Sequence, residues 1–173
     1  MTDHVLNYLK DTLESDLTHV INEYEAFSGI DAFKNNSLTP AFYYEWTIQG
    51  MIYQLLSNLI GLKFNKYILM LEQPYTATDA SVRSDIMWVD LENEHIGALE
   101  LKSNFSYNSF LSDMQKIIIQ LKAGTIAVGV MVFFTDTDDE VGDWIEAAKN
   151  ADKDIKKAIQ SKTLYPVGVP YER

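Results

Sequence analysis

Residues 126–134 form an almost continuous apolar run, with the sequence I-A-V-G-V-M-V-F-F. Such a run is expected of a β-strand that is buried on both faces, because a strand with one face in water alternates apolar and polar residues. A strand of this kind needs helices on each side of its sheet. The run therefore predicts a mixed α/β fold with the sheet in the middle.

The other elements are predicted from periodicity and turn residues. Helical spacing of apolar residues is found over residues 5–28, 40–61, 109–122 and 138–160, the last helix being interrupted near Asn150. Thr39 and Pro40 are expected to open the second helix and Gly61 to close it. Strands are expected over residues 66–72, within 83–102 as a hairpin turning at residues 92–94, over 126–134 and over 163–169, with a polar loop over 73–82.

The expected order of elements is thus α-α-β-β-β-α-β-α-β. It describes a three-strand meander, a crossover helix and a fourth strand, which a right-handed crossover would add to the sheet in parallel. The 173 residues, 47% of them hydrophobic, are expected to form a single domain over 1–173.

Composition excludes several kinds of site. There is no cysteine, so disulfides and thiolate zinc sites are excluded, and the three histidines stand at no metal-ligand spacing. The N-terminus has no basic, apolar signal segment, and no apolar stretch approaches the roughly 18 residues of a membrane span. A soluble, cytoplasmic protein with no membrane partner is expected.

Charged residues interrupt the apolar stripes of the predicted hairpin. Because strand side chains alternate between faces, each strand can be divided into two stripes. Asp85 shares its stripe with Met87, Val89 and Leu91, and Glu100 and Lys102 share theirs with Ile96 and Ala98. Charges are not placed on a buried face without a partner or a metal ion. The pattern therefore marks Asp85, Glu100 and Lys102 as candidate site residues.

A fourth candidate is Glu45 in the second predicted helix. The stripe Ile48, Ile52, Leu55, Leu56 and Leu59 is expected to face the core, and Glu45 lies three residues before its first member. An acidic residue near a helix N-terminus is also stabilised by the helix dipole, by a few tenths to about 1 kcal/mol. Both interpretations are open for Glu45 from the sequence alone.

A helix with a glutamate, followed by D-x(14)-E-x-K across a hairpin and then a helix and a buried strand, resembles the PD-(D/E)XK nuclease superfamily. The similarity covers about residues 40–134, the expected catalytic core. Within it, the segment from G-A-L-E-L-K to A-V-G-V-M-V-F-F is similar to type II restriction endonucleases of the BglII kind. Ser84 stands where the superfamily name has proline, and Lys102 follows the general pattern rather than that subgroup, which often replaces the lysine.

The resemblance implies a restriction-endonuclease-like mixed β-sheet flanked by helices, a Mg²⁺-dependent DNA endonuclease activity that Mn²⁺ also supports, and a homodimer. Asp85, Glu100 and the backbone carbonyl of Leu101 would hold the metal, because Mg²⁺ prefers hard oxygen ligands. Glu45 would bind a second metal or a metal-bound water, and Lys102 would orient or help deprotonate the attacking water. Arg83, Asn104 and Lys116 are candidate DNA contacts.

The net charge of −11 limits the expected affinity for nucleic acid, which normally requires a basic face. Acidic residues are concentrated at both ends, with seven acids over residues 1–31 and eight over 136–157. Residues 32–122 are closer to balance, with nine acids and seven bases. Two alternatives therefore stay open: a non-catalytic immunity or anti-defence protein whose acidic ends bind a basic protein partner or mimic DNA, and a repair or mobile-element nuclease.

The acid-x-lysine pattern occurs a second time, at residues 154–156, in a predicted helix. Residues two apart on a helix do not face one another, so Asp154 and Lys156 are expected to be surface residues. This second pattern provides an internal control for the first.

Overall fold

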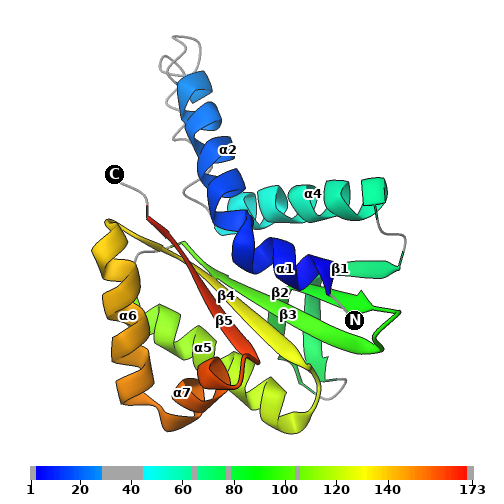
Figure 1. The fold of residues 1–173 in the computed structure, drawn as a ribbon, viewed down its shortest axis with the longest axis vertical. Helices are drawn as coiled ribbons and strands as arrows, with labels where there is room; N and C mark the ends of the chain where they lie inside the picture. Colours follow the sequence, from blue (N-terminus) through cyan, green and yellow to red (C-terminus); the bar gives the residue numbers. More distant parts are fainter. Residues whose placement is uncertain (1–2, 29–44, 64–65, 77–78, 104–105, 171–173) are drawn as a thin grey trace.

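The protein is a three-layer α/β structure with a five-stranded sheet between two layers of helices (Figure 1). The computed structural model describes residues 3–28, 45–63, 66–76, 79–103 and 106–170. Within these ranges, the side chains of residues 24–28, 45–46, 62–63, 72–76 and 79–82 lie outside the description. The expectation of a mixed α/β fold is confirmed.

The strands follow one another across the sheet in the order β1-β2-β3-β4-β5. Their bounds are β1 Tyr67–Thr76, β2 Asp79–Asp90, β3 His95–Lys102, β4 Val128–Thr135 and β5 Leu164–Pro170. The first three are antiparallel neighbours, whereas β4 is parallel to β3 and β5 is parallel to β4. The predicted meander and the parallel strand after the crossover are both confirmed.

Each face of the sheet is covered by its own set of helices (Figure 1). One face carries α1 His4–Asp11, α2 Leu13–Ser28 and α4 Glu45–Lys63. The other carries α5 Tyr107–Ala123, α6 Asp138–Ala151 and α7 Lys153–Gln160. Strand β4 lies between these layers, and all eight of its residues are buried, as its almost continuous apolar sequence predicts.

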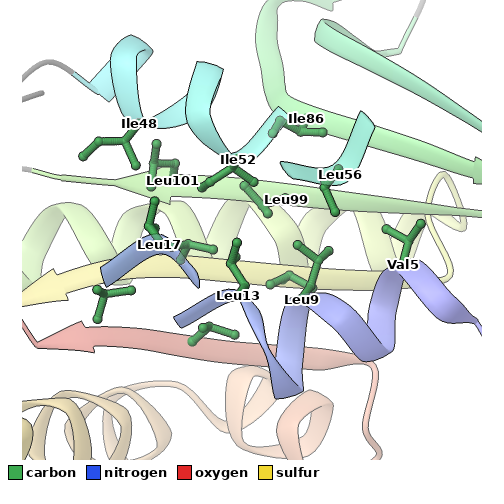
Figure 2. Packing of buried hydrophobic residues seen from close by; sticks show 14 of the residues in the cluster. Val5, Leu9, Leu13, Leu17, Ile48, Ile52, Leu56, Ile86, Leu99 and Leu101 are labelled. Atoms are coloured by element: carbon green, nitrogen blue, oxygen red, sulfur yellow. The ribbon is translucent and has the colours of Figure 1, made fainter. Parts of the chain in front are cut away.

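Two separate hydrophobic clusters join the layers. On the first face, Leu9 and Leu13 of the N-terminal helices and Ile52 of α4 meet Leu99 of β3, and all four are fully buried (Figure 2). On the second face, Phe110 of α5 lies with its ring centroid 4.4 Å from that of Phe133 in β4. Burial of these side chains supplies most of the driving force for folding, at about 25 cal/mol per Å² of apolar surface.

The crossover helix α5 has clear ends. The Ser106 hydroxyl accepts a hydrogen bond from the Ser109 N–H at its start, and Gly124 ends it with φ of 71°, a left-handed conformation in which glycine is unstrained. The predicted helix over 109–122 is therefore confirmed to within two residues.

The predicted N-terminal helix is in fact two helices, separated at Thr12 with φ of −134°. Leu9 and Leu13 stay buried on either side of the break, so the apolar stripe continues although the axis changes direction (Figure 1). Ile21 is fully buried, whereas Val20 is half-buried at the edge of the stripe. The spacing of apolar residues does not reveal the break, because the buried stripe continues on both sides of it.

Two boundaries were predicted wrongly. Helix α4 continues through Gly61 to Lys63, because Gly61 does not adopt the positive φ of a glycine cap. The expected loop over 73–82 is mostly strand, with Gln73 opposite Ser84 and Thr76 opposite Asp79. Backbone hydrogen bonds form this edge hairpin, and they do not require an apolar alternation in the side chains. Residues 39–44, including the predicted helix start, lie outside the described residues.

The C-terminal predictions hold. The helix over 138–160 is interrupted at Asp152, whose N–H donates to Ala148 O while its carboxylate accepts from the N–H groups of Asp154 and Ile155. One residue thus ends α6 and caps α7. In the described part of the chain, none of the helices combines the length and apolar character needed to cross a bilayer.

A glycine in β3 provides a test of the packing. A Cβ atom on Gly97 would lie 2.1 Å from Trp88, which is fully buried, so Gly97→Ala is expected to lower the free energy of unfolding by about 1–3 kcal/mol. The control is Gly50→Ala in α4, where a Cβ would meet no atom within 4 Å and helix propensity should raise stability by about 0.5–1 kcal/mol. Urea denaturation measures both, and equal effects of the two substitutions would contradict this packing.

Candidate functional site

Asp85, Glu100 and Lys102 lie on the same face of the sheet. Met87 in β2 pairs with Ala98 in β3, and both belong to the cluster beneath α5. Asp85 is two residues from Met87, and Glu100 is two residues from Ala98, so strand alternation puts both carboxylates on the α5 face. The two stripes proposed from the sequence therefore lie on the same face of the sheet.

The Asp85 side chain contacts the backbone between the other two candidates. The last pair of the β2–β3 ladder is Ile86 opposite Leu99. One step further, Asp85 Oδ2 accepts a hydrogen bond of 2.6 Å from the Leu101 N–H. The Asp85 carboxylate thus accepts the kind of hydrogen bond that a strand carbonyl usually accepts, at the point where β2 and β3 separate. It lies beside Leu101, the residue between Glu100 and Lys102.

This contact also orients the Leu101 backbone. In a strand, the N–H and C=O of one residue point to the same neighbouring strand. Because the Leu101 N–H points to Asp85, its carbonyl is directed to the same side of β3. The Asp85 carboxylate and the Leu101 carbonyl therefore place hard oxygen atoms on one side of the strand, and oxygen atoms of this kind are the ligands that Mg²⁺ prefers.

Helix α4 approaches this site from the opposite face of the sheet. Gln49 Nε2 donates a hydrogen bond of 2.7 Å to the Asp85 backbone carbonyl. Glu45 is the first residue of α4 and precedes Gln49 by four residues, so both stand on the same side of the helix. The Glu45 side chain is outside the described part, and its proposed role stays a prediction.

Helix α5 adds charged groups that were not among the predicted catalytic residues. Asp113, 5% exposed, forms an ion pair of 3.3 Å with Lys102 through Oδ2. Its other oxygen accepts a hydrogen bond from Lys116. Asp113 is not among the candidate site residues predicted from the sequence. Its position between the apolar residues Phe110 and Met114, on the buried side of the helix, was the available signal.

Several charged residues of the site act on the pKa of Lys116. Burial by itself would lower the pKa of the Lys116 ammonium, but the hydrogen bond and charge of Asp113, with a contribution from Glu100, raise it above its ordinary value of 10.5, against an opposing effect of Lys102. Glu100, Lys102, Asp113 and Lys116 thus form one electrostatic group. We call these four residues and Asp85 the carboxylate–lysine cluster.

The structure describes Arg83 and Lys116, two of the three candidate DNA contacts. Arg83 is exposed within β2, two residues before Asp85, and Asn104 lies outside the described residues. Lys116 is held by Asp113, and its side chain is 44% exposed. Their contact with DNA is untested.

A second acidic group lies near the other end of β3. Ligand atoms of Asp3, Asp90 and His95 all lie within 4.8 Å of one another. This group could not be recognised from the sequence, because His95 is separated from Asp3 by 92 positions and stands at no ligand spacing. Such a set has the composition of a metal site.

The protein itself supplies hydrogen-bond partners to this second group. Asp3 Oδ2 accepts from Trp88 Nε1 at 3.1 Å and from His95 Nε2 at 2.8 Å, while Oδ1 accepts from the Leu6 N–H and caps α1. The Asp90 carboxylate accepts from the Glu92 N–H and from both nitrogens of Asn93. These contacts explain the group as a structural clamp that fixes α1 to the β2–β3 hairpin.

Two surface hollows in the described part of the chain lie away from both groups. One lies between α5 and α7 and includes Lys122, Asp154 and Lys157 in its lining. Another lies between α2 and α4 and includes Thr47, Met51 and Gln54. Neither is lined by the carboxylate–lysine cluster, so the chemistry of that cluster is the stronger guide to function.

Comparison of the chain with protein families, with curated proteins and with solved structures gave no match. Function must therefore be argued from the residues of the site and their arrangement.

The clamp predicts a pH dependence of stability. Burial by itself would raise the pKa of the Asp90 carboxyl, but hydrogen bonds from Asn93 and Glu92 and the charge of His95 outweigh it and lower the pKa below the ordinary value of 3.8. The ionised carboxylate therefore stabilises the fold fully above pH 3.8, and this contribution is lost as the pH falls through the folded-state pKa.

We expect Asp90→Asn to lower the free energy of unfolding at pH 7 by about 1–3 kcal/mol, because a buried, hydrogen-bonded carboxylate is replaced by a neutral amide. The difference from wild type should shrink below pH 3.8, which urea denaturation at several pH values measures. Asp154→Asn, which removes a carboxylate from a more exposed ion pair with Lys122, is the control and should change little. A constant Asp90 effect down to pH 2 would contradict the assignment.

Proposed function

We propose that this protein is a Mg²⁺-dependent DNA endonuclease of the restriction-endonuclease-like kind, hydrolysing phosphodiester bonds as a homodimer. The main support for the proposal is the hydrogen bond that the Asp85 carboxylate accepts from the N–H of Leu101, the residue between Glu100 and Lys102. It brings Asp85 beside the E-x-K residues at the place where β2 and β3 separate, although the D…E-x-K pattern extends over 18 residues of sequence.

The topology supports the same proposal. A helix precedes three antiparallel strands, and a crossover helix then leads to a strand parallel to the third. This is the arrangement that the resemblance implies for residues 40–134. The helices α4 and α5 lie on opposite faces of the sheet (Figure 1), and both contact the cluster, α4 through Gln49 and α5 through Asp113.

The residues suit phosphodiester hydrolysis. Asp85, Glu100 and the Leu101 carbonyl would hold the cation, with Glu45 contributing at a second metal or a bound water. A bound Mg²⁺ would lower the pKa of water and neutralise charge on the scissile phosphate. The Lys102 ammonium would orient the attacking water and stabilise negative charge that develops on the phosphate. Arg83 and Lys116 would contact backbone phosphates.

Purified wild-type protein is expected to cleave plasmid DNA in the presence of Mg²⁺ or Mn²⁺ and not in the presence of a chelator. Asp85→Ala, Glu100→Gln and Lys102→Ala should each lower the cleavage rate at least about a hundredfold, because each removes a group that acts on the reacting phosphate or its metal. Gel analysis of supercoiled, nicked and linear forms gives the rates.

The matched control is the second acid-x-lysine pattern. Asp154→Asn and Lys156→Ala, in α7, should leave cleavage unchanged. Cleavage that persists in Asp85→Ala or Lys102→Ala would refute the site. Discrete fragments from a long duplex would indicate a restriction enzyme, and a smear would favour a repair or mobile-element nuclease.

The alternative is an acidic interaction protein on the same scaffold. It is favoured by the three acidic residues in the first turn of α6, Asp138, Asp139 and Glu140. It predicts neither metal binding nor cleavage. Absence of both from a folded wild-type protein would favour this alternative over the nuclease.

A further inference from the structure

We infer that the groove between α2 and α4 is the contact surface between two copies of this chain, which associate through an antiparallel pair of α4 helices about a two-fold axis. The inference rests on the proposed function for the expectation of a homodimer, and it names the surface that joins the two subunits. It gives a role to the side of α4 opposite to Gln49, the residue that bonds the Asp85 carbonyl.

The groove is the larger of the two hollows described above, with a volume of about 580 Å³ against about 190 Å³. It lies where α2 and α4 contact each other on one face of the sheet (Figure 1). Helix α2 contributes Val20, and α4 contributes Thr47, Gly50, Met51, Gln54, Leu55 and Asn58. Each of these α4 residues is three or four positions from another, so they form one stripe along the helix.

This stripe differs from the one that packs on the sheet. Ile48, Ile52 and Leu56 of α4 are buried in the core, as expected from the sequence. Leu55 was expected to face the core as well, but it is half-buried and borders the groove. Helix α4 thus has one stripe in the core and a second stripe in an open groove.

The charge of the stripe indicates which partner fits it. Helix α4 has no charged residue between Glu45 and Lys63, whereas the chain as a whole has a net charge of −11. Two such chains repel each other, so their association requires a surface that brings few like charges together. A basic protein would instead bind where acidic residues are concentrated. The neutral stripe therefore fits a second copy of this chain rather than a basic partner.

The stripe is also complementary to itself. In a two-fold interface, residue i of one chain contacts residue j of the other, and j contacts i. An antiparallel α4 pair can be centred between Ile52 and Tyr53. The opposed pairs are then Thr47 with Asn58, Gly50 with Leu55, and Met51 with Gln54, and each pair forms twice. All six groove residues of α4 thus meet another groove residue of the second copy.

Two of these pairs match in chemistry and size. Thr47 Oγ1 is buried, and no described residue forms a hydrogen bond with it. Because threonine occupies either of two χ1 rotamers in a helix, this hydroxyl can turn toward the side-chain NH₂ group of Asn58 in the second copy. The Asn58 oxygen already accepts from Gln54 of its own helix at 3.0 Å. A Cβ on Gly50 would meet no atom within 4 Å, which leaves room for the Leu55 side chain opposite it.

The test measures self-association by analytical ultracentrifugation over a series of protein concentrations, and wild type is expected to reach the mass of two chains. Because Gln54 stands opposite Met51, the Gln54 side chains of the two copies are three residues apart, about 4.5 Å along the helix axes. Gln54→Glu therefore places two like charges close together and should weaken dimerisation at least about tenfold. Gln54 is exposed in the single chain, so the variant should fold, which circular dichroism measures.

The matched control is Gln160→Glu. It makes the same change at an exposed residue of α7, which covers the other face of the sheet. The two variants have the same net charge, so a general increase in repulsion between chains would affect both equally. We expect Gln160→Glu to dimerise as wild type does.

A mixture of two variants tests the antiparallel register. Gln54→Lys alone should also dimerise at least about tenfold more weakly than wild type. An equimolar mixture of Gln54→Lys and Gln54→Glu should form a mixed dimer, because opposite charges then meet near the two-fold axis. Absence of the mixed dimer would overturn the inference.

The failure of this inference can be distinguished from that of the proposed function. Wild type that stays monomeric at every concentration, or Gln54→Glu that dimerises as strongly as wild type, would overturn the inference, and the groove would then be left to another protein. A monomer that cleaves DNA with Mg²⁺ would overturn only the interface. A dimer that depends on Gln54 but cleaves no DNA would support the interface and contradict the nuclease.

Discussion

The pairing of β2 with β3 is the interaction on which the candidate site depends. Its ladder ends with Ile86 opposite Leu99, and the next residue of β2 bonds the β3 backbone through its side chain. A slip of one residue would turn Asp85 to the α4 face and bury it in the other cluster. The register is set by apolar side chains on both faces, so the hydrophobic core also determines the position of the carboxylates.

The unfavourable burial of carboxylates on this face is offset by opposite charges within the carboxylate–lysine cluster. Glu100 is 3% exposed and Asp113 5%, and burial of unpaired carboxylates at this depth would be strongly unfavourable. Lys102 and Lys116 provide opposite charges from the strand and from the helix. Such a group contributes little net stability compared with apolar packing, which favours a functional reason for its presence.

The Asp3–Asp90–His95 clamp has a different character although it has a similar composition. Its carboxylates accept backbone and side-chain hydrogen bonds from the turn, from α1 and from Trp88. In addition, the Tyr67 hydroxyl accepts from the His4 N–H at 2.9 Å, and burial together with the charges of Asp3 and Asp90 raises the pKa of Tyr67 to about 12, despite the opposing His4 hydrogen bond. These contacts fasten the start of the chain to the meander and so help to cover the first face of the sheet.

Local sequence determined where the strands and helices lie and which faces of them are apolar. The buried strand at 128–135, the helix α5 and the shared face of Glu100 and Lys102 all follow from periodicity and turn chemistry within a few residues. Only the tertiary structure decided that α1 and α2 separate at Thr12, that 73–82 is mostly an edge hairpin, that Asp113 meets Lys102, and that Asp3 meets His95. Periodicity is a property of neighbouring residues, whereas the meeting of distant charges depends on how whole layers pack, and no local pattern encodes that packing.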